Sequence, residues 1–308
     1  DDGGMGMSAV ELVITLEELG RVADPTPFLA TTSQYVPLVR ACAPPAARRE
    51  LLGPVCAGRT GAVAFATDTV RARPDGDGWV LQGTARHVVD GDRAESLAVV
   101  ATTGDGVGVF VVPAAATAAR TRTFDGSFHL ADVTLDDRRV GADRSWVGAD
   151  VAAAEQRARD EAVAGIAATM VGASQRVLEL VLAHVKERRQ FGVPIGSFQA
   201  VKHMAVDMYV AIERARALCH FAGLTVAEDD PRRALAASMA KAAAGDCQRL
   251  VAQHGIQLFG GLGFTWENDL QIYVRRAKVG EPLLGSTAEH RARAAREVLA
   301  RRRAPEDA

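Results

Sequence analysis

Residues 187–199 read ERRQFGVPIGSFQ and interrupt a chain that is otherwise helical in pattern from about residue 150 onward. Gly192, Pro194 and Gly196 disfavour a continuous helix, and Ser197 is a residue type that caps the start of the next one. Two arginines and an aromatic residue at such a break could also hold a phosphate and stack on a base. The residues alone favour the simpler interpretation, a loop with solvated arginines.

The segments that flank this break carry the apolar periodicity of packed helices. Apolar residues step by three and four from Val163 to Leu180 before it, and from Phe198 to Val226 after it. Such seams are typical of antiparallel helices in a bundle. Asp230-Pro231 predicts the start of a third helix, which ends at Gly260-Gly261. A helix near residues 266–278 and a final one complete the helical part, which we predict to be a four-helix bundle.

The chain before residue 150 has two blocks of different character. Residues 7–52 have helical patterns, punctuated by Asp24-Pro25 and Ala43-Pro44-Pro45. Residues 60–140 contain short β-branched runs separated by turn sequences such as RPDGDG, which is typical of a small barrel or sandwich. The sequence therefore predicts an α+β chain. The expected domains are N-terminal helices over 1–53, a central β-domain over 54–148 and the bundle over 149–308.

The composition is that of an ordinary soluble globular protein. The 308 residues are 48% hydrophobic and 24% charged, and the net charge of −2 favours neither nucleic acid nor an anionic membrane. No apolar run reaches the roughly 18–20 residues needed to span a bilayer. Four cysteines without metal-ligand spacing fit a cytoplasmic location, with Cys219 and Cys247 as core residues, and the scattered histidines predict no metal site. Because the chain opens with DDGGMGMSAVEL and no Met, we expect an N-terminal segment to precede it.

A second glycine-rich stretch, QLFGGLGF at residues 257–264, ends the third predicted helix. Adjacent glycines let backbone N–H groups approach a ligand, although a glycine pair at a helix end is more often only a cap. No strand precedes it, so it is not a dinucleotide-binding fingerprint. ERRQFGVPIGSFQAVKH, QLFGGLGF, YVRRAK and the Gly-Ser-Thr turn together resemble, in order and spacing, the acyl-CoA dehydrogenase family. DDGGMGMSAVEL resembles the family's glycine-rich stretch between early helices.

The resemblance implies an FAD-dependent enzyme that oxidises an acyl-CoA to the 2,3-enoyl-CoA. A glutamate removes the α proton while a hydride passes to the flavin, and pairs of subunits in dimers of dimers share each FAD. One subunit's Arg-x-x-Phe-Gly and Gln-x-x-Gly-Gly stretches hold the adenosine and pyrophosphate of its neighbour's FAD. The residues here that match these contacts are Arg188, Gln190, Phe191, Phe198, Gln199, Gln257, Gly260 and Gly261. Thr67 matches a flavin-facing threonine, and Ser286 is counted with the cofactor contacts.

The turn GEPLLGSTAEH at residues 280–290 departs from the family pattern. Ser286 and Glu289 predict a capping box at the start of the last helix. Aligned from RRAK, the family's usual catalytic glutamate falls on Leu284, which cannot accept a proton. Glu281 precedes it and is interpreted as a solvated turn residue.

A minority of family members place the base on the first long bundle helix instead. That position falls here on Ala162 or Val163, one residue from Glu161. One residue rotates a helix by about 100°, so Glu161 is only a weak alternative base. Asp160 and Glu161 are interpreted more simply as solvated charges.

The β-domain also departs from the family. The loop Thr-Glu-Pro…Gly-Ser-Asp, which embraces flavin and thioester, looks deleted, because AFATDTVRARPDG runs straight on. The family's Trp-x-Thr strand beside the flavin reads His87-Val88-Val89 here. Three losses therefore fall on the half that would hold substrate and isoalloxazine, whereas the stretches that reach a neighbour's FAD are intact.

This asymmetry predicts a half-site subunit that pairs with a catalytic sister chain and leaves the acyl-CoA to the partner's site. Similar heteromeric acyl-CoA dehydrogenases occur in bacterial steroid side-chain β-oxidation. Two alternatives stay open: a self-sufficient homo-oligomeric dehydrogenase with a relocated base such as Glu161, and a non-dehydrogenase on the same fold, such as a flavin-dependent oxygenase or a biosynthetic protein. The sequence names neither the acyl group nor the partner.

Overall fold

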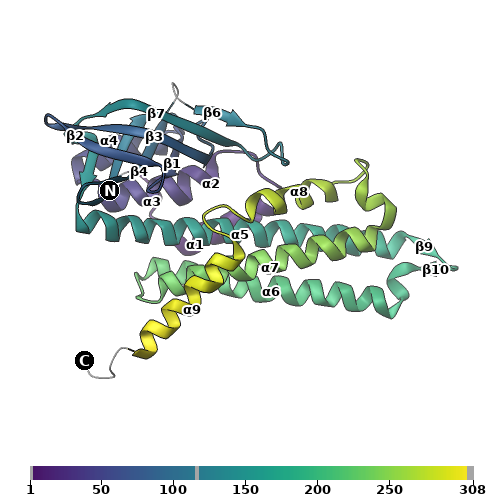
Figure 1. Ribbon diagram of the computed structural model, residues 1–308. Coiled ribbons are helices and arrows are strands. Elements are labelled where there is room, and N and C mark those ends of the chain that lie inside the picture. The colour runs from purple at the N-terminus through teal and green to yellow at the C-terminus, as the bar shows by residue number, and fades with distance from the viewer. Residues whose placement is uncertain (1–2, 115–117, 304–308) are drawn as a thin grey trace. The chain divides into compact units, whose positions relative to one another are not determined.

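The computed structural model describes residues 3–114 and 118–303 (Figure 1). The chain forms two compact units. The first is centred on Pro25–Ala162, and the second combines Ser8–Asp24 with the chain from Val163 onward. The predicted division at 1–53, 54–148 and 149–308 stays a prediction, and the contacts group the chain differently. The difference lies in the first helix, which packs with the C-terminal helices.

The first unit is a sheet with helices on it (Figure 1). Its helical segments are α2 (Phe28–Ala30), the π-helical η1 (Thr31–Tyr35), α3 (Val36–Cys42), α4 (Pro45–Cys56) and η2 (Ala142–Arg144). Its strands are β1 (Gly61–Phe65), β2 (Val70–Asp75), β3 (Gly78–Val89), β4 (Ser96–Thr103), β5 (Gly106–Pro113), β6 (Ala118–Thr121), β7 (Leu130–Val140) and β8 (Ser145–Val147). The strand order is β6-β7-β3-β2-β4-β5-β8, with β1 paired to β4 in parallel. The described strands thus form one eight-stranded sheet in the central region where the sequence predicted a small β-domain.

The core of the first unit lies between the helices and the sheet. It joins helix residues such as Tyr35 and Leu38 to strand residues such as Val100 and Val109, all fully buried. Gly61 lets β1 run against the Tyr35 ring, because a Cβ there would lie 2.3 Å from a ring carbon. The helices cover the apolar face of the sheet, which explains the β-branched runs in the sequence.

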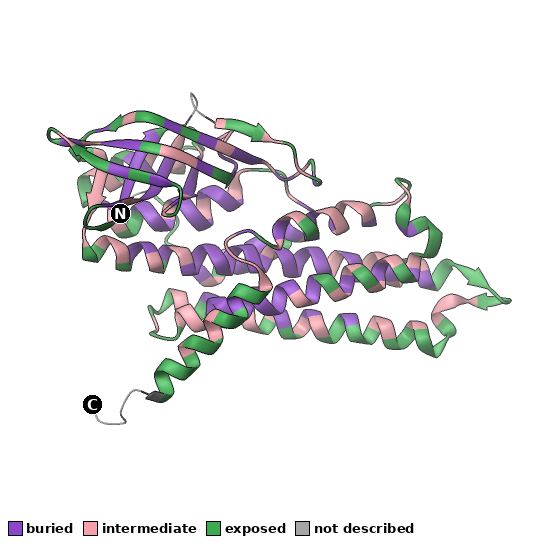
Figure 2. Cartoon of the chain, viewed as in Figure 1, coloured by how far each residue is buried: buried purple, intermediate pink, exposed green. Residues whose placement is uncertain are grey.

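The second unit is helical. Its elements are α1 (Ala9–Arg21), α5 (Ala149–Glu187, which begins in the first unit), β9 (Arg189–Gln190), β10 (Val193–Pro194), η3 (Ile195–Ser197), α6 (Gln199–Ala227), α7 (Arg233–Phe259), η4 (Gly260–Phe264), α8 (Leu270–Gly280) and α9 (Thr287–Arg303). The predicted seams are buried over most of the first and in the middle of the second, from Met208 to Ala222, whereas Phe198 at the start of the second is exposed. Cys219 and Cys247 are core residues, as predicted. The end that carries β9 and β10 is exposed (Figure 2).

A close helix crossing holds α1 in the second unit. A Cβ on Gly172 of α5 would lie 1.8 Å from the carbonyl oxygen of Glu17, and one on Gly20 of α1 would lie 2.2 Å from that of Thr169. The two backbones therefore touch at paired glycines. This contact explains why α1 joins the C-terminal helices.

Helix α5 is long and apolar enough, by length and composition alone, to cross a membrane. The sequence predicts no apolar run of that length, but one window of this helix has a mean hydropathy of 1.3. Of that window, 67% is buried inside the protein. The fold class is confirmed as α+β, with N-terminal helices, a central sheet and a C-terminal helical domain.

We expect Gly172→Ala to lower the free energy of unfolding by about 1–3 kcal/mol, because its methyl group would overlap the α1 backbone. Urea titration monitored by circular dichroism measures this change. Gly280→Ala is the matched control, since a Cβ there meets no atom within 4 Å. Equal stability changes in the two variants would contradict the close crossing.

Candidate functional site

The break that opened the sequence forms a short β-hairpin between α5 and α6. β9 pairs with β10, and the two residues between them, Phe191 (φ +53°) and Gly192 (φ +82°), both have positive φ. A two-residue turn with two positive φ angles matches the twist of a hairpin. The Phe191 side chain is 92% exposed at the tip and meets the Phe198 ring edge-on, with 6.1 Å between centroids.

The predicted contacts to a neighbour's FAD lie on the exposed end of the second unit. All eight of these residues are exposed: Arg188, Gln190, Phe191, Phe198, Gln199, Gln257, Gly260 and Gly261. A Cβ on Gly260 or Gly261 would meet nothing within 4 Å, so the glycine pair faces open space. These positions leave the side chains free to contact another molecule, and their role stays a prediction.

A ring stack joins the two predicted contact stretches. His184, in the last turn of α5, stacks on Phe259, the last residue of α7, at 4.4 Å between centroids and 10° between planes. The N–H of Arg188 donates to the carbonyl of His184 (2.9 Å). Burial, helped by the Arg188 charge, lowers the pKa of His184 and favours the neutral ring. The structure thus brings the ends of α5 and α7 together, which sequence reasoning did not predict.

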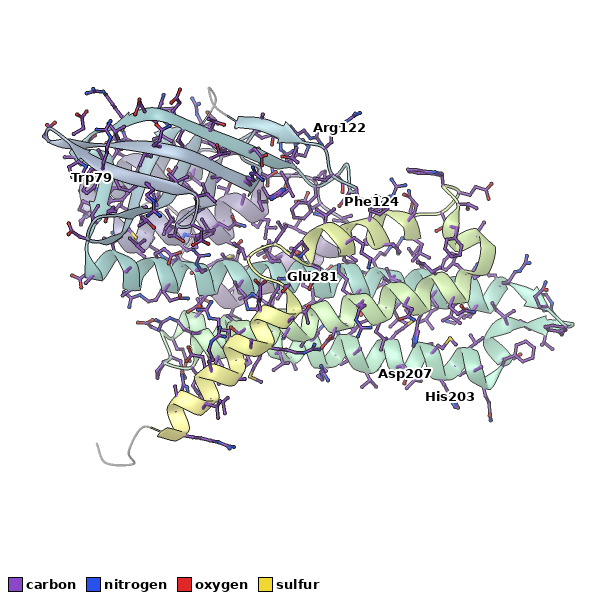
Figure 3. The ribbon with its side chains drawn as sticks, viewed as in Figure 1. Trp79, Arg122, Phe124, His203, Asp207 and Glu281 are labelled. Carbon is purple, nitrogen blue, oxygen red and sulfur yellow. The ribbon has the colours of Figure 1, made fainter. Side chains whose placement is uncertain are left out.

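The turn at 280–290 forms the predicted capping box. The N–H and hydroxyl of Ser286 donate to the Glu289 carboxylate (2.7 and 2.8 Å). Glu281 lies in the turn before α9 (Figure 3). Its carboxylate accepts from the N–H of Thr287 (2.8 Å), the first residue of α9. Glu281 lies in the turn, as predicted, but it is half-buried and its carboxylate caps the helix instead of being only solvated.

A buried lysine, Lys241, is hydrogen-bonded to the backbone of the same turn. Lys241 of α7 has no exposed surface, and its ammonium donates to the carbonyls of Glu281 (2.6 Å) and Gly285 (2.9 Å). Burial lowers the pKa of Lys241 to about 8, against the opposing effect of the Glu281 and Glu289 carboxylates. Sequence reasoning missed this residue, although a single lysine in the small apolar run ASMAKAAAG was the available signal.

Leu284 occupies a strained position in this turn. Its φ is +55°, a conformation that bulky residues rarely adopt. A ring nitrogen of His290 lies 2.9 Å from its carbonyl oxygen, in hydrogen-bond contact, and Lys241 fixes the next carbonyl. Such strain persists only where the surroundings over-determine it, and it clusters at functional sites.

A pocket of about 680 Å³ opens beside the turn within the second unit. Its polar lining comes from three places. Gln248 and Arg249 belong to α7, Lys278 to α8, and Ser286 and Thr287 to the start of α9. The site therefore combines cations with a helix N-terminus, where anions bind favourably.

Gln248 marks this pocket as a place for a polar ligand. The residue is only 5% exposed, and among the described residues its Oε1 has no hydrogen-bond partner. A buried polar atom without a partner is costly, which favours a bound molecule or water at that point. Sequence reasoning did not single out Gln248.

The alternative base, Glu161, is buried in the first unit. Its carboxylate lies 2.9 Å from the Arg40 guanidinium, and burial raises its pKa against the opposing effect of Arg40. Asp160 is 1% exposed and accepts from Gln156 (2.8 Å). The interpretation of both residues as solvated charges is wrong, because the first part of α5 packs inside the unit.

The two β-domain positions singled out by the sequence lie in the first unit. Only residues 66–69 link β1 to β2, and Thr67 is half-buried there, its carbonyl accepting from Thr102 (2.7 Å). His87 sits at a bulge between β3 and β7 with φ +57°, and its N–H donates to Asp132. Bulges often redirect side chains near binding sites.

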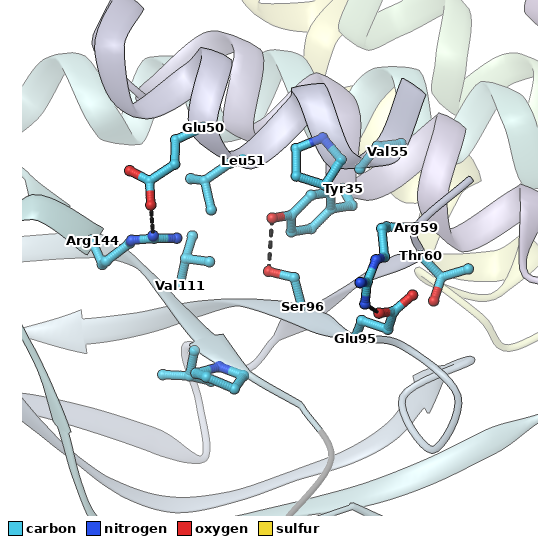
Figure 4. Close-up of a pocket in the computed structure, with 13 residues that line it drawn as sticks. Tyr35, Glu50, Leu51, Val55, Arg59, Thr60, Glu95, Ser96, Val111 and Arg144 are labelled. Atoms are coloured by element: carbon cyan, nitrogen blue, oxygen red, sulfur yellow. Dashed lines mark hydrogen bonds and ion pairs between the residues drawn. The ribbon is translucent and has the colours of Figure 1, made fainter. Parts of the chain in front are cut away.

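The first unit has a pocket of its own, of about 600 Å³, between α4 and the β4–β5 edge (Figure 4). Arg144 pairs with Glu50 and Arg59 with Glu95, while the Tyr35 hydroxyl meets that of Ser96 at 2.8 Å. The charges in this pocket thus neutralise one another. Within residues 3–114 and 118–303, no three His, Cys, Asp or Glu side chains gather to hold a metal.

Comparison with known proteins decides the family. A sequence model of the acyl-CoA dehydrogenase C-terminal domain matches residues 153–299. Acyl-CoA dehydrogenase IpdE2 of Mycobacterium tuberculosis is 32% identical over 292 residues, which span 93% of this chain and 77% of the relative.

This chain belongs to the acyl-CoA dehydrogenase family.

Two solved structures are similar over almost the whole chain. The ChsE4-ChsE5 complex from Mycobacterium tuberculosis has a TM-score of 0.88 at 28% identity and covers 97% of this chain and 82% of its own. A variant of the Tcur3481-Tcur3483 steroid ACAD has a TM-score of 0.88 at 31% identity and covers 99% and 84%. Both are named as assemblies of two proteins.

The family's homologues bind FAD. One fold neighbour, glutaryl-CoA dehydrogenase from Mycobacterium smegmatis, is described in complex with FADH2, with a TM-score of 0.88 at 22% identity, covering 97% of this chain and 82% of its own. The residues present here fit part of such a cofactor. Arg188 and the open Gly260-Gly261 pair suit a pyrophosphate, and Gln248 offers a buried polar atom.

We expect the stability of the chain to rise with pH through the titration of Lys241. The pKa of Lys241 is about 8 in the folded chain and 10.5, its ordinary value, in the unfolded chain. Between these pH values the unfolded chain binds a proton that the folded chain does not, so the free energy of unfolding rises with pH. Lys241→Met should remove this rise, which is up to about 3 kcal/mol between pH 7 and 10. Urea titration at both pH values measures it, with the exposed Lys278→Met as control. Equal pH dependence in all three proteins would contradict the assignment.

Proposed function

We propose that this chain is a subunit of a heteromeric FAD-dependent acyl-CoA dehydrogenase that completes the FAD site of a catalytic partner chain. The observation that carries the proposal is the contrast within the second unit. The exposed contact stretches at the ends of α5 and α7 are intact, whereas Leu284 stands where the family resemblance places the catalytic glutamate. FAD, when bound, supplies the hydride acceptor.

The contacts offered to the partner have the chemistry that FAD needs. The Arg188 guanidinium is exposed and can pair with a phosphate, and Phe191 and Phe198 present aromatic surfaces that suit adenine. The glycine pair admits a pyrophosphate to backbone N–H groups. The His184–Phe259 stack supports both stretches together.

The chain's own chemistry is incomplete. A leucine cannot take the α proton of an acyl-CoA, and the short link at residues 66–69 leaves no loop to cover flavin and thioester. A self-sufficient enzyme would need a relocated base. Glu161 is a poor one, because its carboxylate is buried against Arg40.

The structural neighbours support a partnership of two different chains. Both the ChsE4-ChsE5 complex and the Tcur3481-Tcur3483 assembly are named as pairs, and the second is named a steroid enzyme. By this analogy the partner would be a sister chain of the same fold, in a cytoplasmic heterotetramer that is a dimer of dimers. Its acyl-CoA would be a steroid side-chain or fatty acyl thioester. The purified chain alone is then expected to bind FAD weakly and to oxidise no acyl-CoA.

We expect Arg188→Ala to weaken FAD binding in the complex with the catalytic chain by about 10- to 150-fold, because a charged hydrogen bond contributes roughly 1.5–3 kcal/mol. The measurement is FAD dissociation followed by flavin fluorescence. Arg214→Ala removes an exposed arginine from α6 of the same unit and should leave FAD affinity unchanged. An unchanged dissociation constant in Arg188→Ala would mean that the loop does not reach the partner's cofactor.

Leu284→Glu is not expected to create an active site by itself. A base needs geometry before pKa, and the flavin and thioester lack their covering loop here. Single-turnover flavin bleaching by a range of acyl-CoAs, in the variant reconstituted with FAD, tests this. Bleaching at the rates of ordinary family members would show that only the base had been lost, and the half-site proposal would be wrong.

A further inference from the structure

The start of α9 already carries two carboxylates of its own chain. The Glu281 carboxylate accepts from the N–H of Thr287 (2.8 Å), and that of Glu289 accepts from the N–H of Ser286 (2.7 Å). Free N–H groups at a helix start are what binds phosphate and other anions. Glu289 belongs to a capping box within the helix, whereas Glu281 reaches its partner across the strained turn.

Glu281 is held in this position from both ends. Its carboxylate meets Thr287, and its carbonyl oxygen accepts from the Lys241 ammonium at 2.6 Å. The fully buried Lys241 also fixes Gly285, on the far side of Leu284. The turn therefore has little freedom to withdraw the carboxylate from the helix.

The same carboxylate lines the pocket beside α9, whose lining charges suit an anion. The cations of the lining are Arg249, Lys278 and Arg291, and the anions are Asp246 and Glu281. Arg291 pairs with Asp246. Three positive and two negative groups give a net charge of +1, which would be +2 without Glu281.

A second observation marks this pocket as a ligand site independently of the helix. Gln248 lines it, is 5% exposed, and has an Oε1 without a hydrogen-bond partner among the described residues. A nucleotide could supply the missing donor from an amino group or a hydroxyl. The pocket thus contains a polar atom without a hydrogen-bond partner, the Gln248 Oε1, and a helix N–H group, that of Thr287, which the Glu281 carboxylate already occupies.

We propose that Glu281 is an internal stand-in for a phosphate group, which keeps the diphosphate part of a nucleotide cofactor out of this chain's own pocket. The inference rests on the proposed function, in which the chain serves the FAD of a partner. It deepens that function, because the chain then blocks its own nucleotide site besides lacking a base.

The test measures nucleotide binding to the isolated full chain by titration calorimetry at low salt, with FAD, ADP and adenosine as probes. Glu281→Gln keeps an oxygen that can accept from Thr287 but removes the charge. We expect this variant to bind FAD and ADP about 3- to 10-fold more tightly than the natural chain, since charge at a helix N-terminus acts on anions. Adenosine, which has no phosphate, should show no gain.

Two controls make the result specific. Glu267→Gln removes an exposed carboxylate of the same unit that does not line the pocket, and its nucleotide affinities should not change. Raising the salt concentration should reduce the gain of Glu281→Gln, because the effect is electrostatic. Thermal melting confirms that both variants fold.

Equal affinities of the natural chain and Glu281→Gln for ADP and FAD, including no measurable binding by either, would overturn the proposal. An equal gain for adenosine would also overturn it, because the pocket would then have opened without regard to phosphate. The Arg188→Ala experiment measures FAD binding at the partner's site within a complex. The Glu281→Gln experiment measures nucleotide binding to the isolated chain's own pocket. Either proposal can therefore be contradicted while the other is supported.

Discussion

The second unit depends on a helix crossing so close that only glycine fits. Gly172 of α5 and Gly20 of α1 let two backbones touch, and that contact brings the charged side of α1 within reach of its neighbours. Glu17 then meets Arg216 of α6 at 2.6 Å. The crossing thus positions three helices at once, and the long α5 can extend beyond it to the hairpin that carries the predicted cofactor contacts.

The backbone of the turn between α8 and α9 is also fixed by specific contacts. The Lys241 ammonium, the His290 ring and the Glu281 carboxylate each hold one point of it. Leu284, where the family resemblance predicts a base, therefore lies in a turn whose backbone is held at three points. The buried Lys241 charge therefore favours a unique backbone conformation of this turn.

Local patterns predicted the fold class, the capping box at Ser286 and the buried Cys219 and Cys247, because these depend on periodicity and neighbouring residues. The single sheet and the place of α1 did not follow from them, since both depend on contacts distant in sequence. The Glu161–Arg40 pair was missed for the same reason: two charges in one chain predict solvation until the fold brings them together. The family motifs predicted the FAD contacts, and the structure adds their exposure.

The exposed ring at the hairpin tip has a consequence for how the chain is maintained in a cell. Phe191 is 92% exposed, and burying such a ring is worth roughly 1.5–3 kcal/mol relative to leaving it in water. A partner that covers this ring binds only the folded chain, so it stabilises the folded state by an amount that depends on the concentration of the partner. In the proposed complex, chains without a partner would therefore be less stable and would be degraded sooner than paired ones.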